Sequence, residues 1–398
     1  MFSRRLQQPL RLAIPMLLAG GAALPLAWAG NLPQQLGLRT GREIYQAACA
    51  ACHGPTGNGA PQASAGFDKP SSFPHFDKCD ETTPEYTRDW KAVIRDGGPG
   101  RGFSQIMPSF SGVLDSQQMD RVIEYLRSLC AEKGWPVGEL NVPLALVTEK
   151  AFPESETVLT TSVNAKGSPG VGNTLIYEQI LDKLDQLEVA VPVNWNHRDS
   201  GGYTGGIGDV AVGIKHVLSS HLNSGTGPLF ERTGSILSVQ AEVVLATGDQ
   251  TQGLGSGQTS VGGFAAYDVL LPRQVFLEFQ AGADVPLHSN HGGNAYALSS
   301  GSNAAYFRTA LGKNISGDEN LGRLWSPMVE LVANRNLNAG AITDWDAVAE
   351  FEVTLNRRQH VRAAAGYRVP INDTLGRPKQ ILFYFLWDWF DGGLLEGW

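Results

Sequence analysis

The chain has little charge, few cysteines and, beyond its N-terminus, no long uninterrupted apolar run. Only 18% of its 398 residues are charged, and the formal net charge is −8. This composition offers no basic surface for phosphate groups, so we expect no nucleic-acid partner. After the N-terminal region no stretch reaches the roughly 18 consecutive apolar residues of a transmembrane helix. A helical membrane protein is therefore not expected.

The first 29 residues have the pattern of an export signal. Three arginines precede the apolar run LAIPMLLAGGAALPLAWAG, which ends in Ala27-Trp28-Ala29. A charged start, a short apolar centre and a small-residue cleavage site are typical of secretory signal peptides. Prolines and glycines interrupt the run, which argues against an uncleaved membrane anchor. We expect the mature chain to begin at Gly30 or Asn31.

Two of the four cysteines form a close pair, Cys49 and Cys52, directly followed by His53 in the sequence ACAACHG. In an exported protein the spacing C-x-x-C-H indicates covalent attachment of a c-type haem. Thiols one helical turn apart can add to the two vinyl groups of one porphyrin, and the adjacent imidazole can bind its iron. A zinc half-site would need a second cysteine pair, and a thioredoxin-like redox pair would need a βαβ context.

A second iron ligand is predicted downstream, at Met107. This residue lies before Pro108 in the glycine-rich sequence GGPGRGFSQIMPSFSG, and the chain has only five methionines to compete for the role. Axial ligation by His53 and Met107 would raise the reduction potential and favour electron transfer over catalysis. His75 is the alternative second ligand, and it would give a bis-histidine site.

Residues 38–132 resemble a class I c-type cytochrome. A short amphipathic helix leads into the motif in TGREIYQAACAACHG, and the apolar spacing in LDSQQMDRVIEYLRSLC predicts a closing helix. The CAACH motif, the Met-Pro loop and this closing helix carry the resemblance. It implies a small all-α domain with one covalently attached haem c, in which the last helix packs on the first.

The other two cysteines, Cys79 and Cys130, lie in the same region. Since an exported chain meets an oxidising compartment, we predict a disulfide between them, with two buried free thiols as the alternative. The bond would join the loop before TTPEYTRDW to the end of the closing helix. Residues 133–155 follow, with three prolines and no clear period, and we interpret them as a linker that packs on a neighbouring element.

Residues 156–398 contain about twelve segments of nine to twelve residues in which apolar and polar residues alternate. In Asp346–Asn356, for example, Phe351 falls on the apolar face and Glu350 and Glu352 on the other. A soluble β-sandwich and an outer-membrane β-barrel both give such strands. Strand length, charges opposite the apolar face and alternating short and long connections favour the barrel. Aromatic residues near strand ends agree with interface belts; they are Trp195, Tyr267, Trp325, Tyr367, Trp387 and Trp389.

Part of this region is similar to outer-membrane channels of the phenol-degradation-pathway transporter type. The similarity rests on GGIGDVAVGIKHVL and the following AEVVLATGDQTQGLGSGQTS. The matching residues are Gly208, Asp209, Val210, Gly213, Lys215, Thr247, Gly248 and Asp249. The resemblance implies a barrel that carries small hydrophobic or aromatic compounds. Asp249 is by default a solvated loop charge. The sequence DGGLLEG before Trp398 departs from the pattern and leaves the end of the last strand undefined.

The fold class we predict is a small all-α cytochrome c domain followed by an antiparallel transmembrane β-barrel of about twelve strands. A domain of this size is roughly 30 Å wide and cannot enter a lumen under ~20 Å. Because bacterial barrels begin on the periplasmic side, the domain should sit at the periplasmic mouth. The expected function is electron transfer with periplasmic carriers or other cytochromes, in contact with outer-membrane lipid. One alternative is a channel for small solutes with an accessory redox domain. Another is a ferrous-iron oxidase, by similarity to cytochrome–porin fusions.

Overall fold

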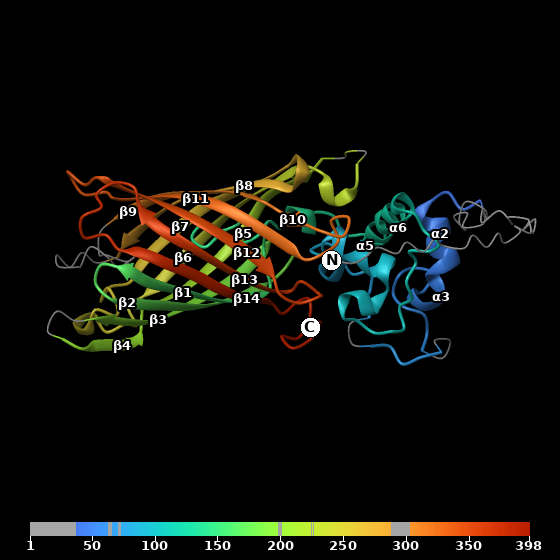
Figure 1. The fold of residues 1–398 in the computed structure, drawn as a ribbon, viewed down its shortest axis with the longest axis horizontal. Helices are drawn as coiled ribbons and strands as arrows, with labels where there is room; N and C mark the ends of the chain where they lie inside the picture. The colour runs from blue at the N-terminus through green and yellow to red at the C-terminus, as the bar shows by residue number, and fades with distance from the viewer. Residues whose placement is uncertain are drawn as a thin grey trace, which may run out of the picture.

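A computed structural model describes residues 37–62, 66–70, 73–197, 201–223, 225, 227–287 and 303–398. A small helical domain lies at one end of a long β-barrel (Figure 1). The predicted order of a small all-α domain followed by an antiparallel β-barrel of about twelve strands is therefore confirmed. The predicted signal peptide, residues 1–29, lies outside the described residues. Within the described ranges no helix combines the length and the apolar character needed to cross a membrane.

The helical domain packs its first and last long helices against each other. Its elements are α2 (Gly41–Ala48), α3 (Ala50–His53), α4 (Cys79–Thr82), α5 (Thr87–Asp96), the 3-10 turn η1 (Gly98–Arg101) and α6 (Ser116–Leu129). Thr40 and Glu43 form a reciprocal capping box that starts α2, and Asp115 and Gln118 do the same for α6. At Gly41 the two helices touch, because a Cβ there would lie 1.8 Å from the carbonyl oxygen of Arg121.

Twelve antiparallel strands close into a barrel, each paired with its neighbours in sequence and the last, β14, with the first, β1. They are β1 (Glu156–Lys166), β2 (Gly170–Ile180), β3 (Asp185–His197), β5 (Val210–Leu222), β6 (Gly234–Leu245), β7 (Ser260–Leu271), β8 (Val275–Pro286), β9 (Ala304–Lys313), β11 (Leu324–Asn336), β12 (Thr343–Thr354), β13 (Val361–Pro370) and β14 (Lys379–Asp388). The short β4 (Tyr203–Ile207) pairs with β3, and β10 (Ile315–Ser316) pairs with β11.

The barrel has an apolar outside and a polar inside. Along β12, Phe351 is 38% exposed on the outer face, whereas Glu350 and Glu352 are buried on the inner face. Along β14, Phe383 and Phe385 face outward and Tyr384 faces inward. An outer face of exposed leucine, valine and phenylalanine is the surface that a lipid-embedded barrel presents.

The predicted linker does not run beside the barrel but enters it. We call residues 138–155 the lumen segment; it begins with the 3-10 turn η2 (Gly138–Leu140). Its apolar side chains are buried against inward-facing residues of many strands. Leu140 and Phe152 pack with Ile236 of β6, and Leu144 packs with Tyr384 of β14. Because its neighbours come from opposite sides of the barrel, the segment occupies the interior.

The backbone of the lumen segment forms no regular ladder and is satisfied by side chains of the barrel wall. Carboxylates and amides accept its N–H groups, and two other wall side chains donate to its carbonyls. The pairs are Leu146 N–Glu350, Val147 N and Thr148 N–Glu330, Glu149 N–Gln280, Ala151 N–Asp268, Glu154 N–Gln186, Tyr384–Leu144 O and Arg308–Val147 O. Buried backbone groups need such partners, so the wall and the segment are matched to each other.

Candidate haem site and its attachment to the barrel

The C-x-x-C-H motif is folded into one turn of helix. Cys49 caps α3, which carries Cys52 and His53, and Gly54 ends the helix with a φ of 75°. The carbonyl of His53 accepts the N–H of Gly59 at 2.9 Å, so the chain turns back immediately after the motif. The motif thus lies on a short helix whose end is held by backbone hydrogen bonds.

The motif residues fit a c-type haem. Cys49 and Cys52 are free thiols of intermediate exposure. The Nδ1 atom of His53 is buried without a hydrogen-bond partner. Burial also lowers the pKa of His53 to about 4, so the imidazole is neutral at physiological pH and keeps a free lone pair for a metal. Two available thiols beside such an imidazole are the groups that haem attachment requires.

The two other chemistries considered for the motif find no support. Burial raises the pKa of Cys49 to about 12, whereas a redox-active cysteine pair needs a lowered thiol pKa. Cys79 and Cys130 are joined in a disulfide with a Cα–Cα distance of 5.1 Å, so they are not available as zinc ligands. In the part of the chain that the structure describes, no group of three His, Cys, Asp or Glu residues is placed to hold a metal ion.

Aromatic rings surround the imidazole. Phe73 stacks on His53 with ring centroids 5.0 Å apart, and Phe76 lies 5.1 Å away. The ring of Phe76 also contacts Trp90 at 5.5 Å. This apolar wall keeps water from the imidazole. His75 lies between the two phenylalanines in the chain, and its role as an alternative ligand stays a prediction.

Met107 lies in a tight loop between η1 and α6. Its carbonyl accepts the N–H of Gly98 at 3.1 Å. A Cβ on Gly97 would come within 2.8 Å of the same carbonyl oxygen, and Gly97 has a φ of 78°. The two glycines therefore allow the Met-Pro sequence to fold back on the chain. The side chain of Met107 is partly buried, and its role as the second ligand stays a prediction.

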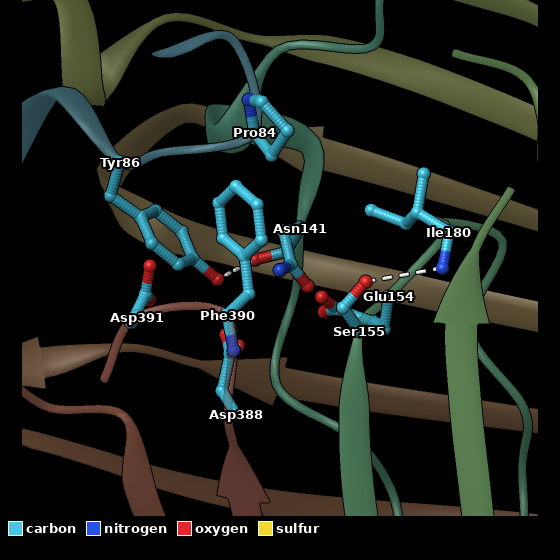
Figure 2. A pocket seen from close by; sticks show the side chains of 9 residues that line it. All are labelled: Pro84, Tyr86, Asn141, Glu154, Ser155, Ile180, Asp388, Phe390 and Asp391. Atoms are coloured by element: carbon cyan, nitrogen blue, oxygen red, sulfur yellow. Dashed lines mark hydrogen bonds between the residues drawn. The ribbon is translucent and has the colours of Figure 1, made fainter. Parts of the chain in front are cut away.

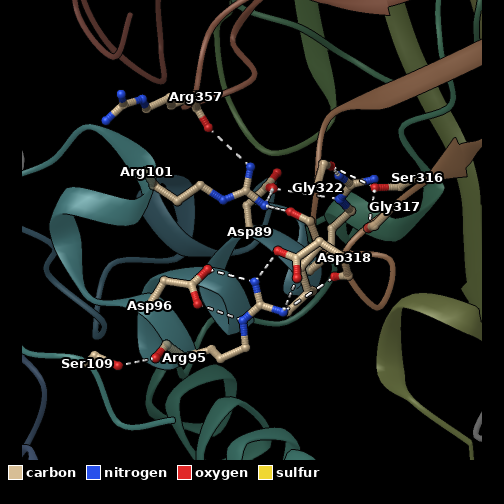
Figure 3. Close-up of polar contacts among 12 residues, drawn as sticks. Asp89, Arg95, Asp96, Arg101, Ser109, Ser316, Gly317, Asp318, Gly322 and Arg357 are labelled. Atoms are coloured by element: carbon tan, nitrogen blue, oxygen red, sulfur yellow. Dashed lines mark hydrogen bonds and ion pairs between the residues drawn. The ribbon is translucent and has the colours of Figure 1, made fainter. Parts of the chain in front are cut away.

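Arginines of the helical domain bind the turns at one end of the barrel (Figure 3). Arg95 pairs with Asp318 in the β10–β11 connection, and Arg101 donates to the carbonyls of Leu321 and Arg357. Beside them, the buried Arg88 donates to the carbonyl of Gly322 and the side chain of Gln359. The sequence analysis did not identify these residues. The spacing of Arg88, Arg95 and Arg101 on one short segment was the only signal for them.

A second contact surrounds a small pocket at the barrel mouth (Figure 2). Tyr86 of the helical domain donates to the carbonyl of Asn141 in the lumen segment, and Asp388 and Asp391 approach from the C-terminal end of β14. Next to this pocket, burial and nearby aspartates raise the pKa of Glu85 to about 7, partly offset by its hydrogen bond with Asp391. The pKa of Asp391 is also raised by burial and by Glu85.

The residues of the second sequence resemblance have structural roles here. Asp209 accepts hydrogen bonds from the backbone N–H groups of Gly248 and Ser256 and thereby organises the β6–β7 loop. Asp249 caps the next turn in that loop through Thr251. Lys215 is buried in the lumen, 3.8 Å from the carboxylate of Glu178. None of these contacts points to a reaction at this loop.

Comparison with known proteins assigns the helical part. Residues 37–126 match the family model described as cytochrome C oxidase, cbb3-type, subunit III. Solved structures similar to the chain include the NanC porin, with 7% identity over 58% of this chain and 98% of that one at a TM-score of 0.38. They also include an outer membrane channel from Pseudomonas putida F1, with 14% identity over 60% and 97% at 0.39. The curated proteins contain no match. Residues 37–126 are therefore a cytochrome c domain, which implies haem c, joined to a closed twelve-stranded β-barrel.

Proposed function

We propose that the protein is a monohaem c-type cytochrome, held at the periplasmic mouth of an outer-membrane β-barrel, that exchanges electrons with periplasmic carriers. The observation that carries this proposal is the C-x-x-C-H turn, with two free thiols beside a neutral imidazole whose Nδ1 atom is buried without a hydrogen-bond partner, inside a cytochrome c domain. A bound haem would supply a one-electron iron couple.

The residues of the domain have separate roles in this proposal. Cys49 and Cys52 would hold the porphyrin through thioether bonds, and His53 would bind the iron through its ring. Phe73 and Phe76 shield the imidazole from water, which helps keep it neutral. Met107 would be the second ligand, and ligation by histidine and methionine suits electron transfer because it leaves no open coordination position.

The outer face and the connections of the barrel support the membrane location and the orientation. Exposed leucines, valines and aromatic residues cover the outside, as lipid contact requires. The cytochrome domain binds the end that carries the short connections after β2, β7 and β12 together with the longer ones after β5 and β9, whereas the long β6–β7 loop lies at the other end. Bacterial barrels have short turns in the periplasm and longer loops outside. This pattern supports a periplasmic location for the cytochrome domain.

The lumen segment weighs against the solute-channel alternative. It occupies the barrel interior and is held there by carboxylates from several strands, so solute flux would require its displacement. The iron-oxidase alternative needs electrons to cross the barrel from the outer face. The chain has no second C-x-x-C-H motif to help them do so. A tethered electron carrier requires neither step.

Attachment and redox function can be tested on the full-length protein, expressed with a c-type haem maturation system. We expect haem staining that comigrates with the chain, reversible reduction by a soluble periplasmic cytochrome, and loss of the stain in C49S/C52S. The variant C79S/C130S is the matched control, because it also replaces two cysteines of the same domain but should keep the haem. Retention of covalent haem in C49S/C52S would contradict the proposal.

Orientation can be tested in whole cells. A reductant that does not cross the outer membrane should leave the cytochrome oxidised in intact cells and reduce it after permeabilisation. Reduction at equal rates in both samples would place the redox site on the outer face. That result would favour the iron-oxidase alternative.

A further inference from the structure

We infer that the turns at the docked end of the barrel position the loop that carries Met107, so that Arg95, Arg101, Asp318 and Arg358 act as positioning residues for this ligand. The inference rests on the proposed function, in which Met107 binds the iron. We call residues 97–110 the ligand loop. Three sets of contacts connect this loop to the barrel.

The first set acts through Arg101, at the end of η1. Its side chain is buried between the two domains, with the residue only 5% exposed. The guanidinium donates to the carbonyl of Leu321 and, at 3.1 Å, to the carbonyl of Arg357. Asp89 of α5 lies 3.1 Å away and compensates its charge. The start of the ligand loop is thus bound to two connections of the barrel at once.

The second set acts through Arg358, in the β12–β13 turn. Its guanidinium donates to the carbonyl of Gly102 at 3.2 Å and lies 4.3 Å from the ring centroid of Phe103. Glu396 of the C-terminal tail pairs with the same guanidinium. The tail also touches the loop directly, because a Cβ on Gly102 would lie 2.6 Å from the Cα of Gly397.

Backbone hydrogen bonds connect these anchor points to Met107. The N–H of Phe103 donates to the carbonyl of Gly98 at 2.8 Å, and the N–H of Gly98 donates to the carbonyl of Met107 at 3.1 Å. Phe103, which Arg358 contacts, is therefore two hydrogen bonds from Met107, and Gly98, in the same 3-10 turn as Arg101, is one.

The third set acts on the other side of Met107, through Arg95. Its guanidinium binds Asp318 of the barrel, while its carbonyl accepts the hydroxyl of Ser109 at 2.6 Å and the N–H of Ser111 at 3.1 Å. One residue thus links the barrel to the chain just after Met107. The ligand loop is held on both sides of its methionine.

The ligand loop has little apolar burial of its own to keep it ordered. Ile106, next to Met107, is 41% exposed, and the ligand loop contributes only the partly buried Phe110 to the packing around the domain's apolar core. Segments with few buried apolar contacts open locally at low free energy. The polar contacts with the barrel therefore add to the backbone hydrogen bonds of the domain in fixing where Met107 lies.

The test compares two double variants of the full-length, haem-loaded protein in detergent. D318A/R358A removes contacts between the barrel and the ligand loop. E124A/R232A, the matched control, removes the ion pair between the β5–β6 connection and α6, at 3.0 Å, which does not touch the loop. Hydrogen–deuterium exchange of residues 97–110 is measured in both variants and also in haem-free protein. The charge-transfer absorption of ferric iron bound to methionine is recorded in parallel.

We expect exchange in the ligand loop to become roughly tenfold faster in D318A/R358A, since charge-assisted hydrogen bonds are lost, and to stay unchanged in E124A/R232A. The methionine absorption should weaken only in the first variant. Equal exchange in both variants, with or without haem, would overturn the inference. Failure of the proposed ligation gives a different result, because M107A would then leave the absorption spectrum unchanged. The exchange data would still decide whether the barrel positions the loop.

Discussion

Thr148 donates two hydrogen bonds to the carboxylate of Glu330, from its backbone N–H at 2.7 Å and from its hydroxyl at 2.6 Å. The N–H of Val147 donates to the other carboxylate oxygen at 3.1 Å. One buried side chain of β11 thus satisfies three donors of the lumen segment. This relationship explains how a proline-containing segment without regular structure stays inside a barrel.

The substitution E330A should loosen the middle of the lumen segment. It leaves three buried donors without their acceptor, at a cost of about 1–3 kcal/mol for each. We expect faster hydrogen–deuterium exchange around Val147 and Thr148. Q240A is the matched control, because Gln240 is a buried lumen side chain that bonds to Glu188 of the wall. Unchanged exchange in E330A would contradict the structural role of this carboxylate.

The same variant tests the channel alternative. If the barrel transports small solutes once the lumen segment moves, E330A should raise solute flux into liposomes above that of the wild type and of Q240A. Equal flux in all three proteins would favour the tethered electron carrier.

The substitution G41A should destabilise the cytochrome domain by several kcal/mol. The added Cβ would lie 1.8 Å from the carbonyl oxygen of Arg121, so α2 and α6 would have to separate. Calorimetry of the full-length protein should show a lower transition temperature for this domain. G112A is the control, since nothing lies within 4 Å of a Cβ at Gly112. Similar transition temperatures for the two variants would contradict the helix contact at Gly41.

The strands of the barrel could be predicted because two environments act on alternate residues. Lipid favours Phe351 outside, while the interior accepts Glu350 and Glu352, and this contrast is readable in the sequence. The haem motif was readable because its chemistry needs Cys49, Cys52 and His53 at fixed spacing. Both predictions rested on local patterns.

The lumen segment and the docking arginines could not be predicted from such patterns. The backbone of residues 138–155 pairs mostly with side chains more than a hundred residues away, so it has no period of its own. The partners of Arg95 and Arg101 lie more than two hundred residues downstream, in turns whose positions only the closed barrel determines. One signal was available: glutamates and glutamines recur on the inner face of the strands, and their side chains can accept hydrogen bonds from a segment inside the barrel. Glu278, Glu330 and Glu350 are examples.

Loss of the Cys79–Cys130 disulfide should lower the stability of the cytochrome domain by about 4 kcal/mol, if the bond acts by restricting the unfolded chain. The cysteines are 51 residues apart, and loops of this length lose much entropy when they are closed. We expect C79S/C130S to unfold at lower denaturant concentration than the wild type. A reductant should bring the wild type to the level of the variant and leave the variant unchanged. A further effect of the reductant on the variant would point to another disulfide and contradict the assignment of the effect to Cys79–Cys130.

The contact around Glu85 should weaken as the pH rises. Burial raises the pKa of Glu85 from its ordinary value of 4.5 to about 7, so the folded protein binds more protons than the unfolded one between these values. Stability therefore falls with increasing pH across this window and levels off above about pH 7. At 1.36 kcal/mol for each pKa unit, the largest effect is about 3 kcal/mol.

Calorimetry of the cytochrome domain between pH 4.5 and pH 8 can check this expectation. E85Q should reduce the pH dependence and raise the transition temperature at pH 8, because an amide needs no proton to be accommodated beside Asp391, whose own raised pKa leaves the remaining dependence. E81Q is the matched control, since Glu81 lies in α4 and pairs with Lys78 at the surface. If the transition temperature of E85Q depends on pH as strongly as that of the wild type, a group other than Glu85 causes the dependence. An increase of stability with pH in the wild type would show that the carboxyl of Glu85 is charged in the folded state.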